Sequence, residues 1–321
     1  MAYRFESDED IREAIRRCAR EQLDHAVSEL SEWISEDPVT AVHSARKAVK
    51  RERSLLRLSR GAMPSEQLRL ENRALRRAAR GLSRARDAEV MIQTVEELSE
   101  RFAGQLPQAT FAAIGEQLAV VRDQQRARLQ GSALSPRAAG ELGSVRLRVD
   151  DWRIRGNGWR TIEPGLLHSY RRGRQAFATT RRHPSFENLH AWRKRVTDLW
   201  YQERLLAPIC GPAVKGQAKD AHRLADLLGD DHDLGLLRHI LTHDHLDAAV
   251  DLDAVVGLID HRRAELQSDA AHLGERVYAE TPKAFRRRIK RSWKAGRATA
   301  QAVREHDPAE LATVTRVPHH E

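Results

Sequence analysis

Residues 43–47 read His-Ser-Ala-Arg-Lys, and residues 190–194 read His-Ala-Trp-Arg-Lys. The two stretches begin 147 positions apart. A second pair of landmarks, Arg86-Asp87 and His232-Asp233, recurs 146 positions apart, and each member follows a leucine-bearing helical pattern. Because two separate landmarks repeat at nearly one offset, we expect the chain to contain a tandem duplication of one structural unit.

The spacing of apolar residues around these landmarks is that of helices. From Asp8 to about Gln130, leucine, valine and isoleucine recur every three or four residues, as at Leu23, Val27 and Leu30. This period is typical of amphipathic helices, and no run of alternating β-branched residues competes with it. The sequence therefore predicts an all-α fold.

Proline and glycine punctuate the expected helices. Asp37-Pro38 and the segment 61–64 interrupt the first part of the chain, and the stretch 131–165 is the longest that is rich in Gly, Pro and polar residues. We expect this stretch to separate the two halves. The predicted organisation is a first helical half over 8–150, a second over 160–305, and a polar C-terminal tail over 306–321.

The charge of the chain points to an anionic partner. Its 321 residues include 55 Lys and Arg against 46 Asp and Glu, a net charge of +9, and the pI is about 10.0. A basic protein of this kind is expected to attract polyanions. Aromatic residues make up only 5% of the chain and are not interleaved with the basic runs, which argues against a platform for stacking nucleic-acid bases.

Cysteine usage and hydropathy bear on where the protein works. Cys18 and Cys210 are the only cysteines and do not form a CxxC pair, so neither a disulfide framework nor a cysteine metal site is predicted. No apolar run approaches the roughly 18 residues that a membrane span needs. We expect a cytoplasmic protein in a reducing compartment, without membrane association.

Basic residues recur at helical spacing after residue 43. At 100° per residue they fall within about 120° of one helix face. The apolar Val42, Ala45 and Val49 occupy the adjoining sector, so the helix can bury one edge and present the basic stripe to a groove or pore. The members in the first half are His43, Arg46, Lys47, Lys50, Arg53 and Arg57. The corresponding positions in the second half are His190, Arg193, Lys194 and Arg204, with Arg204 placed like Arg57.

A second basic stripe precedes Arg86, and its copy in the second half is weaker. The first-half members are Arg73, Arg76, Arg77, Arg80 and Arg84. At an offset of 146 these become Lys219, His222, Arg223, Asp226 and Asp230. We therefore expect an asymmetric site that takes most of its charge from the first half.

A solvated helix face is the alternative interpretation of any such stripe. Here, however, seven Lys or Arg between His43 and Arg60 face a single acid, Glu52. Like charges at i and i+4 destabilise a helix by a few tenths of a kcal/mol each. An anionic ligand that offsets this repulsion is therefore the favoured interpretation.

The repeated motif resembles that of the CHAD family, named for its histidine-bearing α-helical domain. The resemblance lies in His43-x-x-Arg46-Lys47-x-x-Lys50-x-x-Arg53 and its echo at 190–194. Segments 82–90 and 227–234 are similar to the family's paired Asp-bearing turns, and Pro164-Gly165 with 170–174 resembles its central helix. The likeness extends over roughly residues 8 to 300.

The resemblance implies two pseudo-symmetric helical bundles around a central basic channel that binds inorganic polyphosphate, with no established catalytic reaction. It also carries the central-helix residues Tyr170, Arg171 and Arg174 into the candidate site, to which Lys219 and Arg223 add charge. Thr197 and Trp200 stand where a lysine and an arginine equivalent to Lys50 and Arg53 are expected, so binding from the second half is expected to be weaker.

The favoured hypothesis is a non-enzymatic protein that binds polyphosphate, with no cofactor and no metal, and polyphosphate granules are a candidate location for it. One alternative is a non-specific nucleic-acid-binding protein, because the same stripes would neutralise a DNA or RNA backbone. Another is an enzyme with His43 or His190 as phosphoacceptor, or a metal hydrolase.

The enzyme alternatives lack a complete motif. His232-Asp233 and the pair His243 and His245 could bind metal, but helix-terminal roles without a ligand are favoured for them. For Asp87 and Asp233 we expect structural support of neighbouring residues. There is no HExxH motif, and Gly156-Asn157-Gly158 lacks the lysine of a phosphate-binding loop.

Overall fold

The structure is a computed structural model that describes residues 3–82, 84–130, 134–243 and 251–313, with the backbone alone at 84–88, 126, 128–130 and 303–313. Within these residues the chain forms α-helices and one short 3₁₀ helix and no strand, which confirms the predicted all-α fold.

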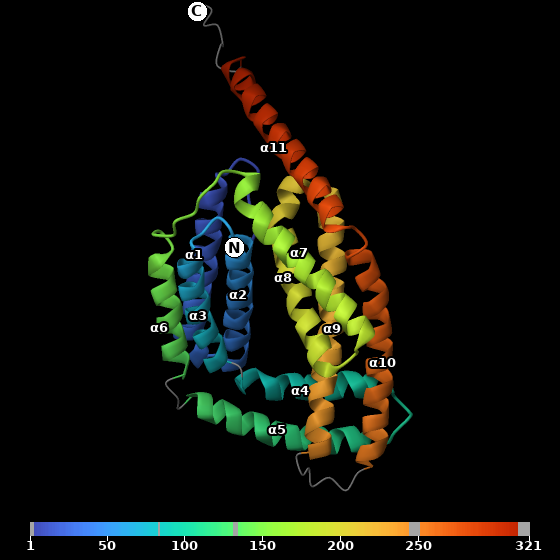
Figure 1. Ribbon diagram of the computed structural model, residues 1–321. Helices are drawn as coiled ribbons and strands as arrows, with labels where there is room; N and C mark the ends of the chain where they lie inside the picture. The colour runs from blue at the N-terminus through green and yellow to red at the C-terminus, as the bar shows by residue number, and fades with distance from the viewer. Residues whose placement is uncertain (1–2, 83, 131–133, 244–250, 314–321) are drawn as a thin grey trace, which may run out of the picture.

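The first six α-helices occupy the first half of the chain. They are α1 (Ile11–Ser31), α2 (Pro38–Leu58), α3 (Ser65–Gly81), α4 (Arg84–Arg101), α5 (Gln108–Gln130) and α6 (Leu134–Arg148), with the 3₁₀ helix η1 (Trp33–Ser35) between α1 and α2. Helix α1 packs against α2 and α6, and α3 packs against α6. These four stand side by side in Figure 1, whereas α4 and α5 run crosswise below them and reach the lower ends of α9 and α10.

The second half contributes five helices. They are α7 (Trp159–Arg182), α8 (Phe186–Cys210), α9 (Pro212–His243), α10 (Leu252–Val277) and α11 (Pro282–Thr313). Helix α8 packs against α7, α9 and α11 and also against α2 of the first half. Helix α11 extends away from the other helices (Figure 1) and continues into the segment 306–321, for which the sequence predicts a tail.

Two apolar cores hold the helices together, and each draws on both halves of the sequence. The larger core joins α1, α2, α3 and α6 to α7, α8 and α11. In the smaller core, Met91 and Phe111 from α4 and α5 pack with Leu237 and Ile259 from α9 and α10. The α4–α5 hairpin thus packs on helices of the second half, and the division at 8–150 and 160–305 stays a prediction.

The start and end of α2 follow from local sequence. Asp37 caps the helix by accepting hydrogen bonds from the backbone N–H groups of Val39 and Thr40, each at 3.1 Å. Pro38 occupies the first turn, where its missing N–H costs nothing. Beyond Leu58, Gly61 has a φ of 93°, which suits glycine. The predicted breaks at 37–38 and 61–64 are confirmed.

The stretch 131–165, predicted to separate the two halves, is helical over much of its length. Residues 134–148 form α6, whose Ala138, Leu142 and Val145 are buried at helical spacing against α1 and α3. Its glycines, Gly140 and Gly143, lie where an added Cβ would meet no atom within 4 Å, so they do not interrupt the helix. Tertiary packing of the apolar face outweighs the local propensity of the glycines.

Helices α2 and α8 meet at a contact that we call the seam, made by Ser54, Asp198 and Gln202. The Ser54 hydroxyl donates to the backbone oxygen of Asp198 at 2.9 Å, and the Gln202 amide donates to the backbone oxygen of Ser54 at 3.2 Å. Gly165 lets α7 approach the end of α2, because a Cβ there would lie 2.0 Å from the Leu58 carbonyl oxygen. Three helices therefore converge at the seam.

Candidate anion-binding site

Basic side chains from four helices gather around the seam. We call this set the seam cluster; its members are Arg53 and Arg57 of α2, Arg76 of α3, His168 and Arg172 of α7, and Lys194 and Arg195 of α8. They lie close enough for the charge of one to depress the pKa of another. Helix α2 can present Arg53 and Arg57 here because its opposite face is buried in the core.

One carboxylate lies inside the seam cluster. Asp198 Oδ1 accepts a hydrogen bond from Arg57 Nη1 at 2.9 Å, and its Oδ2 lies 3.6 Å from Arg195 Nη1. Its side chain is only 11% exposed. Burial raises the pKa of Asp198, and the charges of Arg57 and Arg195 act in the opposite direction. A single acid cannot neutralise the cluster, which retains a net positive charge.

The cations of the seam cluster repel one another. Burial, then the charges of Arg57 and Arg76, lowers the pKa of Arg53 to about 10. Burial and the neighbouring charges of Arg195 and Arg53 also lower the pKa of Lys194. An anion at the seam would relieve this repulsion and restore these values.

His168 extends the cluster along α7. Arg60 Nη1 lies 2.7 Å from His168 Nε2; since a guanidinium can only donate, the imidazole nitrogen is the acceptor. Burial, and then the charges of Arg60 and Arg172, lowers the pKa of His168. The free protein therefore holds a neutral imidazole beside an arginine, a pair that can gain a proton when an anion binds.

The stripe predicted for the first half is only partly at the seam. Arg46 donates to the backbone oxygen of Leu82 at 2.9 Å and so joins α2 to the end of α3. Lys47 and Lys50 are exposed and His43 is half-buried on the same helix. On α3, Arg73 and Arg80 are exposed like Arg76. Arg77 instead makes a bidentate ion pair with Glu141 of α6, with both distances 2.8 Å. The side chains of Arg84 and Asp87 lie outside the described residues.

The family of the chain follows from comparison with known proteins. The sequence profile of the CHAD domain matches residues 17–242. This chain belongs to the CHAD domain family. No protein with a curated description matches it significantly.

Two solved structures share the CHAD fold. The CHAD domain from the plant Ricinus communis superposes with a TM-score of 0.64 at 17% identity, covering 88% of this chain and 96% of that one. PptA from Streptomyces chartreusis gives a TM-score of 0.59 at 15% identity, covering 84% and 99%. At such identities the likeness is one of fold.

In the second CHAD motif the histidine is held in an aromatic stack. The ring of His190 lies 4.2 Å from that of His232, which in turn stacks on Phe186 at 4.9 Å. Burial, then the charges of Lys194 and Arg193, lowers the pKa of His190 to about 4. Burial and the neighbouring His190 lower the pKa of His232 to about 3. The Nδ1 atoms of both rings are buried without a hydrogen-bond partner.

The helix-terminal role expected for His232 is wrong, because the residue lies well inside α9. His243 does end α9, and His245 lies outside the described residues. Asp233 lies 3.8 Å from Arg193, as expected for a supporting acid. Among the described residues no group of three His, Cys, Asp or Glu side chains is arranged to hold a metal ion.

Tyr170, expected in the site, lies away from the seam cluster. Its side chain is fully buried, stacks on Phe285 at 3.9 Å and donates to the Glu280 backbone oxygen at 2.9 Å. Arg174 donates to the same oxygen at 2.5 Å. Both residues lie on the side of α7 opposite His168 and Arg172, about 200° around the helix. Arg171 is exposed, and its charge reaches His168.

Arg204, predicted to be placed like Arg57, lies away from the seam cluster. Together with Lys219, Trp200 and His222 it lines a cavity of about 480 Å³ between α8 and α9, whereas Arg57 contacts Asp198. The two positions on α8, 198 and 204, are about 120° apart around the helix, which separates the cavity from the seam. Arg223 is exposed on α9.

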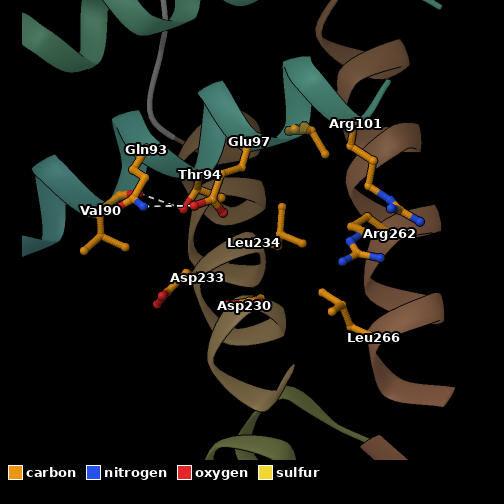
Figure 2. Close-up of a pocket in the computed structure, with 11 residues that line it drawn as sticks. Val90, Gln93, Thr94, Glu97, Arg101, Asp230, Asp233, Leu234, Arg262 and Leu266 are labelled. Carbon is orange, nitrogen blue, oxygen red and sulfur yellow. Dashed lines mark hydrogen bonds between the residues drawn. The ribbon is translucent and has the colours of Figure 1, made fainter. Parts of the chain in front are cut away.

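An acidic cavity lies beyond the second motif. It has a volume of about 260 Å³ between α4, α9 and α10. Figure 2 shows Glu97, Asp230 and Asp233 around it, with Arg101 and Arg262 at one side. Burial and the charge of Glu97 raise the pKa of Asp230 to about 6. The acidic side chains make this cavity unsuited to a polyanion. This agrees with the sequence, in which Asp226 and Asp230 stand at the positions that correspond to Arg80 and Arg84.

Sequence reasoning missed Arg172, Arg195, His168 and Asp198. At the repeat offset of 147, Arg195 aligns with Ala48, so a search for shared positions passes over it. His168 and Arg172 carry a signal that was available, since their i,i+4 spacing places them on one face of α7. The local sequence pairs Asp198 only with Arg195, whereas its hydrogen-bond partner Arg57 is 141 residues away.

Proposed function

We propose that this protein binds inorganic polyphosphate at the seam cluster without catalysing a reaction. The observation that carries the proposal is the convergence of cations from α2, α3, α7 and α8 on one partly exposed region around Asp198. Membership of the CHAD family supports it, because that resemblance implies polyphosphate binding and no defined reaction.

The electrostatics of the seam cluster suit a chain of phosphates. Guanidinium groups bind phosphate oxygens through two parallel hydrogen bonds, and the neighbouring Lys194 adds a point charge. The lowered pKa values of Arg53, Lys194 and Arg195 reflect burial and mutual repulsion among groups that the fold holds together. A polyanion that contacts several of them gains from relief of that repulsion as well as from direct contact.

The composition of the cluster favours polyphosphate over single-stranded nucleic acid. His168 is its only aromatic member, whereas proteins that bind single strands present aromatic rings on which bases stack. A site of charges and hydrogen-bond donors matches a ligand that has only phosphates. We place the protein in the cytoplasm and, through its ligand, on polyphosphate granules; a central basic channel lined by the cluster is part of the same proposal.

The test is calorimetric titration of the full chain with long-chain polyphosphate. A seam variant, Arg172→Gln with Lys194→Gln and Arg195→Gln, removes three cations and leaves the Arg57–Asp198 pair. A matched control, Arg137→Gln with Arg153→Gln and Arg160→Gln, removes the same charge from exposed positions elsewhere. Charge-assisted contacts are worth about 1.5–3 kcal/mol each, so the seam variant should bind about 100-fold more weakly or worse, and the control within about threefold of wild type. Equal losses in the two variants would refute the site.

A further inference from the structure

Helix α11 carries a second basic surface, outside the region that matches the CHAD profile. Five of its cations fall within about 100° of one face and span roughly 17 Å along the helix axis. We call them the α11 stripe; they are Lys283, Arg287, Lys290, Arg291 and Lys294. The matched region ends at residue 242, and none of the five residues belongs to the seam cluster.

The opposite side of α11 fixes the helix to the protein. Phe285, Ile289 and Trp293 are buried there, and α11 contacts both α7 and α8. A Cβ on Gly296 would lie 1.7 Å from the Ile209 carbonyl oxygen, so the backbones of α11 and α8 touch. The stripe is therefore presented outward by the first part of α11, which is anchored on the bundle, whereas the later part of the helix extends away from it (Figure 1).

The α11 stripe is not neutralised within the protein. In the described part of the chain none of its five side chains has an ion pair or a hydrogen bond, whereas Arg286 and Arg288 on its flank pair with Glu163 and Glu280. No acidic residue occurs between Pro282 and Arg304. Like-charged pairs at i,i+4, such as Lys283 with Arg287 and Lys290 with Lys294, weaken the helix, which points to an external anion.

We propose that the α11 stripe binds the phosphate backbone of double-stranded nucleic acid without reading its sequence. One strand of a duplex carries a phosphate about every 3.4 Å, so roughly five phosphates occupy the length of the stripe, which offers five cations. The outward face of an anchored helix is convex and can lie along a duplex, whose major groove is about 12 Å wide. The seam cluster is built from four packed helices and does not present the face of a single helix in this way.

The residues around the stripe do not suit a membrane surface. Helices that lie in a membrane interface bury large apolar side chains beside their cations. The exposed large apolar residues of the described chain lie on η1, α3, α5 and α6, and none lies on α11. Binding of anionic lipid is thus the competing outcome of the test.

The experiment measures the affinity of the full chain for a short random-sequence DNA duplex over a range of salt concentrations. The stripe variant carries Arg287→Gln, Lys290→Gln and Lys294→Gln, and the control is the Arg137, Arg153 and Arg160 variant described above. Each lost phosphate contact should reduce the slope of log affinity against log salt by about 0.9. We expect a reduction of about 2.7 and a loss of about tenfold or more in affinity at low salt for the stripe variant, and neither for the control.

Two further titrations separate the possible ligands. Long-chain polyphosphate should bind the stripe variant as it binds wild type, and the seam variant should keep its affinity for the duplex. An unchanged DNA slope in the stripe variant would overturn the proposal, and so would loss of binding to phosphatidylserine vesicles with DNA binding intact. If the stripe variant lost affinity for polyphosphate as well as for DNA, the stripe would be a second polyphosphate site, and this result would also overturn the proposal. If the seam variant kept the wild-type affinity for polyphosphate, the function proposed above would be refuted, but the proposal for the α11 stripe would not be affected.

Discussion

Helices α2 and α8 carry the same His-x-x-Arg-Lys motif and touch at the seam, yet they bring different groups to it. Helix α2 supplies Arg53 and Arg57, whereas α8 supplies Lys194, Arg195 and the acid Asp198. Only Lys194 among these three belongs to the repeated motif. The difference teaches that the repeat fixes where two helices lie, and that the charges at their junction come largely from positions the two copies do not share.

Helices α2 and α8 share a buried glutamate on the side that faces the core. Each buries one glutamate, Glu52 in α2 and Glu203 in α8, and both carboxyl groups lack a hydrogen-bond partner. Burial, with a smaller effect of nearby Glu71, raises the pKa of Glu52 to about 8. Burial likewise raises the pKa of Glu203 well above its ordinary value. Glu52 is therefore mainly protonated at neutral pH and does not offset the cations on the other side of α2, and burial disfavours the charged form of Glu203 in α8 as well.

The largest expected effect tests this shared feature. A carboxyl whose pKa is raised on folding stabilises the protein fully below its unfolded pKa of about 4.5 and loses that contribution as pH rises through the folded value. The free energy of unfolding should therefore fall between about pH 5 and pH 8. Because one pKa unit corresponds to about 1.36 kcal/mol, Glu52 contributes on the order of 5 kcal/mol to this fall.

Urea denaturation of Glu52→Gln at pH 5, 7 and 9 measures that contribution. The variant should lose much of the decline with pH and should be more stable than wild type at pH 9. Glu203→Gln serves as the counterpart in α8, and the variant with both changes should lose more of the decline with pH than either single variant. A double variant with the full wild-type decline would show that neither buried glutamate is protonated.

The second prediction separates two arginines of the same helix. Arg57→Ala leaves the buried Asp198 with only Arg195 at 3.6 Å, and breaking a buried ion pair costs about 3–5 kcal/mol. The remaining partner puts the expected loss near the lower figure, about 3 kcal/mol. Arg53→Ala instead removes a cation whose pKa is lowered by burial and by its neighbours, at the cost of one 3.3 Å hydrogen bond to Asn72.

Thermal and urea unfolding of both variants give the measurement. Arg53→Ala should cost less than about 1 kcal/mol and should still weaken polyphosphate binding. Arg57→Ala should be clearly the less stable protein. Equal stability of the two would mean that Arg57 and Asp198 are no more coupled than exposed charges.

Much of this arrangement was predictable from the sequence, for identifiable physical reasons. Helices have a strong local signal, so the all-α fold and the helix breaks at Asp37-Pro38 and 61–64 could be predicted. Helix α6 could not, because its burial against α1 and α3 depends on distant packing. The same dependence on packing limits the prediction of the site. Both sides of α7 are rich in polar groups, so the sequence could not show that Arg172, and not Tyr170, lies in the seam cluster.

The smallest expected effect concerns the two motif histidines. With a pKa of about 4 in the free protein, His190 is neutral at pH 7.5, so His190→Gln should change polyphosphate affinity by less than about threefold there. A bound polyanion favours the imidazolium, and proton uptake should then strengthen binding as pH falls. The window for this effect lies between about 4, the pKa of His190 in the free protein, and the raised pKa in the complex.

Calorimetry at pH 7.5 and pH 5.5, with NMR titration of the imidazole signals, tests this in both helices. The wild type should gain more affinity on acidification than His190→Gln, and the His190 signal should titrate at a higher pH in the complex. His43→Gln in α2 is the matched change, because its ring occupies the same motif position without being part of the stack of His190, His232 and Phe186. The depressed pKa of His190 also predicts lower stability of the free protein as pH falls from about 6.5 toward 4, a loss that His190→Gln should reduce. If both histidine variants kept the wild-type pH dependence of affinity and of stability, the proton taken up on binding would have to go elsewhere, and His168 beside Arg60 is the next group in the seam cluster with a lowered pKa.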